Sequence, residues 1–415
     1  MPTDAVAVPA TAPLRRGDIR RTEDCRRTTN ASAVLHAVLD HGPVARSTVA
    51  RLTSLSPAAV SRLSADLIAA GLLREVPEAD GPKRVGRPHV PVEVDVGRRV
   101  ACGLHIAAGH ATLALVDLRG RVMARERTAH AGAGPQQVLQ RAASRIPEFL
   151  DEHAGGRVPL GLGVASGGWV DDAHGVIVEN AVLGWRGVRA RDLLASATGL
   201  PVYVSGHARA LARAEQMFGN ARARASVAHL FVGNVVDAAF ATGSLVHHGP
   251  RSAAGSVAHL PAEGSDDPCS CGRQGCLQAA VSSQTLSLRA ERLGITPGPA
   301  FEALLAAARA GESRAVALFR DRARLVGAMA ALLLDVLNPE VLIVTEQGVI
   351  WLPECLDDLR DEVGRRSRVC RDPARSVFAT SFGGDALCVA GGAVILDAVY
   401  ANPLRRRRAV MPRAS

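Results

Sequence analysis

Residues 56–71 read SPAAVSRLSADLIAAG, and this stretch determines how the N-terminal part of the chain folds. Ser56 is a favoured helix N-cap and Pro57 suits the first helical position, so a helix is predicted to begin here. Gly71 is a common residue just after a helix and predicts where this one ends. One face of the helix carries apolar residues at helical spacing: Val60, Leu63 and Leu67.

The segments on both sides of this helix complete a motif. Helical spacing of apolar residues begins at Asn30 and stops near residue 41, and a second short helix is predicted over residues 46–53. C-terminal to the helix, residues 72–76 and 90–96 favour two strands joined by a polar tip, because valines alternate along the second of them. Three short helices followed by a β-hairpin are the outline of a winged helix-turn-helix domain.

In such domains the third helix enters the major groove of DNA, and the hairpin contacts the backbone or the minor groove. Small side chains allow close approach to base edges, and serine and arginine can hydrogen-bond to bases or phosphates. Double-stranded DNA is therefore the predicted partner. The alternative is a helical interaction domain whose arginines are simply solvated, and the order of the elements favours DNA binding. The candidate DNA-contacting residues lie on the helix and at the hairpin tip: Ser56, Ala58, Ser61, Arg62, Lys83, Arg84 and Arg87.

The composition sets wider limits. A chain of 415 residues is long enough for two or more domains, and a hydrophobic fraction of 47% with 3% aromatics predicts cores built from aliphatic side chains. Lys and Arg outnumber Asp and Glu by 49 to 40, but Lys83 is the one lysine, so overall basicity is weak evidence for a nucleic-acid partner. The sequence has no secretory h-region and no long uncharged apolar window, which predicts a cytoplasmic protein without a membrane span.

Both ends of the chain are predicted to be disordered. Residues 1–29 are polar and rich in Pro, Ala and Arg, and residues 401–415 contain an arginine run at 405–408. We interpret the run as solvated charge, with phosphate contact as the alternative. Between these ends, strands and helices alternate from Val100 onward, which favours α/β layers.

A cysteine cluster lies in the second half of the chain. Residues 269–276 read CSCGRQGC, and His259 lies ten residues before the first cysteine. Three thiolates and one imidazole complete a closed tetrahedral shell, so this set predicts a structural zinc (Zn2+) site and not a catalytic one. The alternative is three unligated cysteines in a loop. The other cysteines are scattered, which argues against a secreted disulfide framework. The predicted ligands are His259, Cys269, Cys271 and Cys276.

Together these features resemble the ROK family of repressors and sugar kinases. The resemblance covers about residues 30–400, and its specific parts are the His/Cys set, the winged-helix stretch and the run from Ala208 to Glu215 that leads to Phe218-Gly219. It implies an actin-like (ribonuclease H-like) α/β body of two lobes at 97–400 behind a winged helix at 30–96. It also implies that the protein forms a homodimer or tetramer. Regulators of this family control sugar-utilisation genes and sense a sugar, a sugar phosphate or a transport protein.

The chain departs from the kinases of this family at the phosphate and acceptor sites. Those enzymes carry an aspartate and a glycine pair in the first strand, where this chain has His105 and alanines at 107 and 108. The added Cβ atoms crowd the approach of backbone to phosphate. The kinases' Glu-Asn-Asp triplet, whose aspartate takes the proton of the sugar hydroxyl, reads Ser205-Gly206-His207 here.

The sugar and adenosine positions change as well. Two carboxylates that hold sugar hydroxyls in the kinases are replaced by Ser256 and Gln278. The stretch that carries a glycine pair on the adenosine side of the kinases reads Thr345-Glu346-Gln347-Gly348 here. These changes predict a regulator without kinase activity; the alternative is an active kinase that phosphorylates a hexose with ATP. Neutral hexoses are expected to bind weakly or not at all, and a phosphorylated or acidic sugar derivative is the candidate effector. The degenerate effector pocket is assigned to five positions: His105, Gly206, His207, Ser256 and Gln278.

Overall fold

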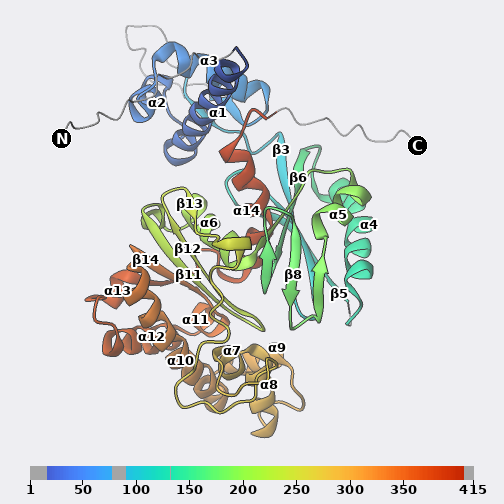
Figure 1. Cartoon of the computed structure of the whole chain (residues 1–415), viewed down its shortest axis with the longest axis vertical. Helices are drawn as coiled ribbons and strands as arrows, with labels where there is room; N and C mark the ends of the chain where they lie inside the picture. Colours follow the sequence, from blue (N-terminus) through green and yellow to red (C-terminus); the bar gives the residue numbers. More distant parts are fainter. Residues whose placement is uncertain (1–15, 77–89, 131, 406–415) are drawn as a thin grey trace, which may run out of the picture. The chain divides into compact units, whose positions relative to one another are not determined.

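The computed structural model describes residues 16–76, 90–130 and 132–405, and the side chains of the first helix from residue 26 onward. The described chain divides into two compact units. One unit holds the residues up to Asp95 together with 398–405, and the other holds Val96–Asp397. Figure 1 labels the elements of both units, which are described separately below.

The N-terminal unit contains three helices followed by two antiparallel strands. The elements are α1 (Arg16–His41), α2 (Arg46–Thr53), α3 (Pro57–Ala69), β1 (Leu73–Glu75) and β2 (Val92–Val94). The helix α3 begins as predicted, because the Ser56 side chain accepts a hydrogen bond from the Ala59 N–H. Val60 and Leu67 are fully buried, so the expected apolar face forms the core of this unit. The elements follow one another in the order of a winged helix-turn-helix domain.

The N-terminal helix is longer than the sequence pattern indicates. It begins at Arg16, so the predicted disordered arm over residues 1–29 is wrong from that point on; residues 1–15 lie outside the described part of the chain. The last proline before the helix is Pro13, and nothing in the polar stretch after it breaks a helix. Arg27 donates to Asp66 of α3 at 2.9 Å, which ties this early turn to the domain. The hairpin tip with Lys83, Arg84 and Arg87 lies outside the described residues.

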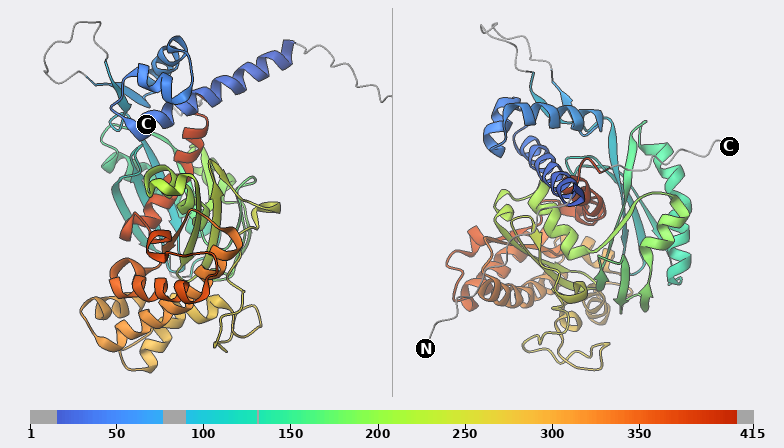
Figure 2. Two further views of the ribbon diagram at one scale, coloured as in Figure 1. Left: turned by 90° about the vertical axis from the view of Figure 1, so that its left-hand side faces the viewer. Right: turned by 45° about the horizontal axis from the view of Figure 1, so that its top comes forward.

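The first lobe of the body is built on a five-stranded sheet with the order β10-β6-β3-β4-β5. One face of this sheet is covered by α4 and α5 (Figure 2), whose apolar side chains share a core with the sheet. A separate three-stranded sheet, β7-β8-β9, completes the lobe. The bounds are β3 (Arg99–Ile106), β4 (His110–Val116), β5 (Val122–Ala129), α4 (Pro135–His153), β6 (Val158–Ser166), β7 (Trp169–Asp171), β8 (Val176–Asn180), β9 (Trp185–Val188), α5 (Ala190–Thr198) and β10 (Val202–Gly206).

The second lobe has a sheet of the same size, with the order β13-β12-β11-β14-β15. Helices α7 to α12 share one core with a face of this sheet. The body is thus the two-lobed α/β structure that the resemblance implies. The bounds are α6 (His207–Phe218), β11 (Ser226–Val232), β12 (Val236–Thr242), β13 (Leu245–Val246), α7 (Leu277–Val281), α8 (Ser283–Arg292), α9 (Phe301–Arg309), α10 (Ser313–Leu337), β14 (Val341–Thr345), α11 (Gln347–Trp351), α12 (Pro353–Arg366), α13 (Pro373–Ser376), β15 (Val377–Ala379) and α14 (Ala386–Ala401).

The last helix, α14, touches the first sheet backbone to backbone. A Cβ atom built on Gly163 of β6 would lie 2.1 Å from the carbonyl oxygen of Gly391, and one on Gly103 of β3 would lie 2.6 Å from the amide nitrogen of Gly392. Glycine is therefore required on the strands, because the helix passes where a side chain would project. This contact places α14 directly on the centre of the sheet.

The apolar character of α14 follows from this position. By length and composition, the stretch Gly383–Ala401 is the one described helix that could cross a membrane, but 61% of it is buried inside the protein, as in a core helix. The helix runs to Ala401, the first residue of the predicted disordered tail, and residues 406–415 lie outside the described part.

Replacing Gly163 with alanine should destabilise the body. The added methyl group overlaps the Gly391 carbonyl, so α14 must shift, and overpacking of this kind costs about 1–3 kcal/mol of unfolding free energy. Gly109→Ala is the control, because a Cβ atom there meets nothing within 4 Å. Urea unfolding of both variants checks the prediction, and equal stability of the two would contradict it.

Candidate functional site

Two buried histidines meet between the lobes of the body. His105 lies on β3 and His207 is the first residue of α6; their side chains are 4% and 3% exposed, and their rings stack with centroids 6.0 Å apart. Phe231 of β11 packs on His207 at 3.9 Å. Burial, and after it the neighbouring His207, lowers the pKa of His105 well below its usual value. The imidazole of His105 is therefore buried in its uncharged form.

The ring nitrogens of both histidines lack hydrogen-bond partners among the described residues. Asp237 of β12 places Oδ2 3.0 Å from Nε2 of His207, close enough for an ion pair but not aligned as a hydrogen bond. The same oxygen accepts from the Gly168 N–H at 3.1 Å. A third buried histidine, His229, lies 3.0 Å from the Thr345 hydroxyl, and burial lowers its pKa to about 3. The sequence did not indicate Asp237 or His229, because only the pairing of their strands brings these residues to this site.

The other predicted pocket residues lie around this pair. Gly206 precedes α6 as its N-cap, and a Cβ atom there would lie 3.0 Å from the Arg209 guanidinium. Gln278 on α7 accepts a hydrogen bond from the Val236 N–H at 3.3 Å, directly before Asp237. Ser256 is exposed, and no described contact joins it to the other four. The structure thus brings His105 and His207 together, with Gln278 on the adjoining strand.

A buried ion pair involves Glu346, which lies in the stretch compared by sequence with the adenosine side of the kinases. Glu346 and Arg322 are both fully buried and form a direct ion pair. Glu346 also accepts from the N–H groups of Gly348 and Val349 at 2.8 and 2.7 Å, so it caps α11. The Arg322 guanidinium lies 5.3 Å from the ring of Phe319. Both charged side chains are therefore fully engaged within the protein.

Ser205 and Arg209 are both bound to one carboxylate. The Ser205 hydroxyl donates to Asp172 at 2.5 Å, and Arg209 donates to the same side chain at 2.7 Å. Arg209 is buried and also reaches the Val170 carbonyl at 2.8 Å. The neighbouring Asp171 instead pairs with the exposed His174 at 2.8 Å. These bonds hold the start of α6 in place.

The four predicted metal ligands do converge. Their ligand atoms all lie within 4.8 Å of one another, with Sγ of Cys269 3.6 Å from Nδ1 of His259 and the sulfurs of Cys271 and Cys276 3.7 Å apart. A tetrahedral zinc site with Zn–S bonds of about 2.3 Å has edges of about 3.7 Å, so the donor set fits zinc in both type and spacing. The Arg273 side chain lowers the pKa of the Cys271 thiol to about 6, whereas burial raises that of Cys276 to about 11.

The helix α3 presents its predicted contact residues to the outside. Ser56, Ala58, Ser61 and Arg62 are all exposed, on the side away from the buried face. The Ser56 oxygen is engaged as the helix cap, at 3.3 Å from the Ala59 nitrogen. Arg62 has no ion-pair partner in the described part of the chain, so its guanidinium is available to another molecule.

Replacing Glu346 with alanine should strongly destabilise the body, because it leaves Arg322 buried and unpaired. Loss of one partner of a buried pair costs about 3–5 kcal/mol of unfolding free energy. Glu179→Ala, which breaks an exposed pair with Arg186, should cost less than about 1 kcal/mol. The double variant Arg322→Met/Glu346→Leu should recover most of the loss. Denaturant unfolding measures all three, and an equal cost for the two single variants would contradict the prediction.

Comparison with known proteins identifies the family of this chain. The family model described as "ROK family" matches residues 101–398. A protein of Mycobacterium tuberculosis named as a transcriptional regulator is 34% identical over 388 residues, which cover 90% of this chain and 86% of the relative. The DNA-binding transcriptional repressor Mlc of Escherichia coli is 26% identical, over 91% and 95% of the two chains.

Solved structures share the fold. A ROK family transcriptional regulator, described as a homologue of the E. coli Mlc protein, matches with a TM-score of 0.73 at 22% identity, over 92% of this chain and 98% of that one. A ROK family glucokinase from Streptomyces griseus, in complex with glucose and AMPPNP, matches with a TM-score of 0.62 at 24% identity, over 71% of this chain and 98% of that one. With most of its body matched by the family model and a relative at 34% identity along most of its length, the chain belongs to the ROK family.

Proposed function

We propose that this protein is a DNA-binding transcriptional regulator, and specifically a repressor of carbohydrate or related metabolic genes. The observation that carries the proposal is α3, a capped helix with a buried apolar face and an exposed face of small, polar and basic residues. The three-helix and two-strand order around it supports the same function. Relatives named as transcriptional regulators and repressors extend along most of the chain.

In this proposal α3 reads the major groove. Ala58 and Ser61 allow close approach to base edges, and Arg62 hydrogen-bonds to a base or a phosphate. Lys83, Arg84 and Arg87 of the hairpin tip contact the backbone or the minor groove. A homodimer or tetramer of the body would present two such helices to half-sites related by two-fold symmetry. A cytoplasmic location accompanies this function, because the chromosome lies there.

We also propose that the body has lost kinase activity. Phosphoryl transfer needs a carboxylate or equivalent base at the acceptor and room for backbone to approach the phosphates. The acceptor position holds His207, which is buried against Phe231, and the adenosine side holds the Glu346–Arg322 pair. An active hexose kinase remains the second candidate function in this family, and these two observations count against it. The region around His105, His207 and Gln278 would instead hold an acidic or phosphorylated sugar derivative as effector.

The cysteine cluster would hold one structural zinc ion. His259, Cys269, Cys271 and Cys276 supply a full tetrahedral shell, so the metal would stabilise the loop and would not activate water. Gly272 and Gly275 support this assignment, because both take positive φ values, 87° and 70°, that tighten the loop around the sulfurs. Cys276 is also the N-cap residue of α7, which carries Gln278.

Substitution of Arg62 tests the DNA-binding proposal. Genome-wide mapping of bound DNA would first identify duplex sites for the full-length protein. Arg62→Ala should then weaken binding to those sites by tenfold or more, because a lost base or phosphate contact costs about 1–3 kcal/mol. Arg292→Ala, on the exposed end of α8 in the body, is the matched control. Failure to find enriched duplex sites, or unchanged affinity in Arg62→Ala, would refute the proposal.

Substitution of Cys271 tests the zinc proposal. The purified protein should contain about one zinc per chain, and Cys271→Ser should lose it and melt at a lower temperature. Cys271 is exposed, so the substitution removes a ligand without opening a hole in the core. Cys370→Ser, outside the cluster, should keep the metal. Elemental analysis and thermal melting decide the matter, and a zinc-free variant that melts like the parent would show that the site is dispensable.

A further inference from the structure

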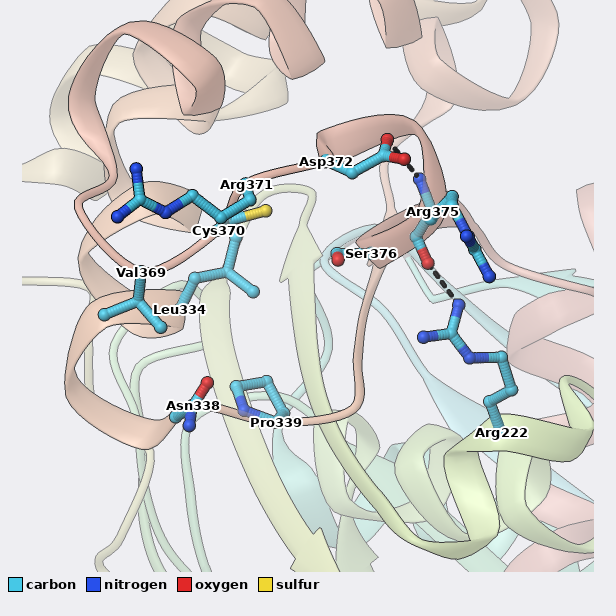
Figure 3. Close-up of a pocket in the computed structure, with 10 residues that line it drawn as sticks. All are labelled: Arg222, Leu334, Asn338, Pro339, Val369, Cys370, Arg371, Asp372, Arg375 and Ser376. Carbon is cyan, nitrogen blue, oxygen red and sulfur yellow. Dashed lines mark hydrogen bonds between the residues drawn. The ribbon is translucent and has the colours of Figure 1, made fainter.

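A cavity lies in the second lobe, away from His105 and His207. It has a volume of about 320 Å³ and is bordered by the loop between α12 and α13, the last turn of α10 and the residues just before β14 (Figure 3). This volume is within the range of small-ligand sites. Pro339 borders the cavity just before β14 begins, whereas Thr345, which contacts the cleft histidine His229, is the last residue of that strand. The two sites are therefore at opposite ends of β14.

The lining of this cavity is basic. It includes Arg222, Arg371 and Arg375 against one acid, Asp372. Figure 3 shows the guanidinium groups of Arg222 and Arg375 on the same side of the cavity. Arg222 pairs with Glu340 at 2.7 Å, but no acidic side chain in the described chain pairs with Arg375. Arg222 and Arg375 therefore have one acidic partner between them, Glu340, and the positive charge of Arg375 is not neutralised at the cavity wall.

Asp372 does not neutralise this cation. Its carboxylate accepts from the Arg375 backbone N–H at 3.2 Å and caps α13, so it is used within its own turn. Arg222 also donates to the Arg375 carbonyl, which fixes the backbone of Arg375 beside it. The Arg375 guanidinium is thus left exposed, and its backbone is bonded to Arg222, whose guanidinium lies on the same side of the cavity (Figure 3). Paired guanidinium groups are the preferred protein partners of phosphate, because their N–H groups match its oxygens.

The loop on the other side of the cavity is held in shape before any ligand arrives. Asp335 of α10 accepts from the backbone N–H groups of Arg368 and Val369 at 3.0 and 3.2 Å. The Ser367 hydroxyl accepts from the Cys370 N–H at 2.8 Å. Such a loop loses little conformational entropy on binding. Val369 is 44% exposed, and together with Leu334 and Pro339 it gives the cavity an apolar side.

We propose that this cavity binds a small organic phosphate, with the phosphate between Arg222 and Arg375 and the organic part against Val369, Leu334 and Pro339. The proposal does not depend on DNA binding or on the cleft, because none of these residues belongs to either. It assigns a second ligand site to the body, separate from the degenerate effector pocket. An organic phosphate is the expected ligand because the cavity combines positive charge with an apolar wall.

Calorimetry on the full-length protein tests this proposal with three probes: glucose 6-phosphate, inorganic phosphate and glucose. Glucose 6-phosphate should bind, inorganic phosphate should bind more weakly, and glucose should not bind at this site. Arg375→Gln should weaken glucose 6-phosphate binding by tenfold or more, because a hydrogen bond between charged groups is lost. Arg368→Gln is the matched control, since Arg368 lies on the same loop but does not line the cavity, and its affinity should stay within about twofold of the parent.

Three outcomes would overturn the proposal. The first is no heat from glucose 6-phosphate at millimolar concentration. The second is binding that Arg375→Gln leaves intact, which would locate the ligand elsewhere, including the cleft. The third is equal affinity for inorganic phosphate, which would remove any role for the apolar wall. Thermal melting of both variants verifies that they fold, and Arg375 is exposed, so its substitution leaves the core unchanged.

Discussion

The backbone contact of α14 with the first sheet is the constraint on which the body depends. Because Gly103 and Gly163 leave no side chain in the way, the helix lies close enough for its other side to meet α6 and the second sheet. Ala386 and Ala390 of α14 share a core with Leu211 of α6 and Ile343 of β14. The two lobes are therefore assembled around a middle layer of two helices. His207 is the first residue of α6, so this packing also determines where its imidazole lies.

The buried polar side chains of the body fall into two kinds. Glu346 and Arg322 satisfy one another in a buried ion pair. His105 and His207 are buried with ring nitrogens that have no hydrogen-bond partner among the described residues. The first arrangement is complete without a ligand. The second leaves ring nitrogens without partners, and buried polar groups of this kind call for an explanation such as a bound water or a small molecule.

The sequence predicted well the features that depend on neighbouring residues. The cap at Ser56, the apolar face of α3 and the close spacing of Cys269, Cys271 and Cys276 are all local, and the structure reproduces them. It could not predict contacts between distant segments, such as Asp237 with His207 or Arg222 with Arg375, because these depend on how strands pair and helices pack. The early start of α1 at Arg16 was missed for another reason: polar composition resembles disorder when the residues that stabilise a helix, such as Asp66, lie on a different element.

The N-cap role of Cys276 joins two regions that are otherwise described separately. Its backbone begins α7, whose Gln278 accepts the Val236 N–H beside Asp237, the carboxylate nearest His207. The hydrogen bond at the start of β12 is therefore made only two residues away from one of the four converging ligand side chains. A change in the position of the Cys276 backbone would reach this strand through Gln278.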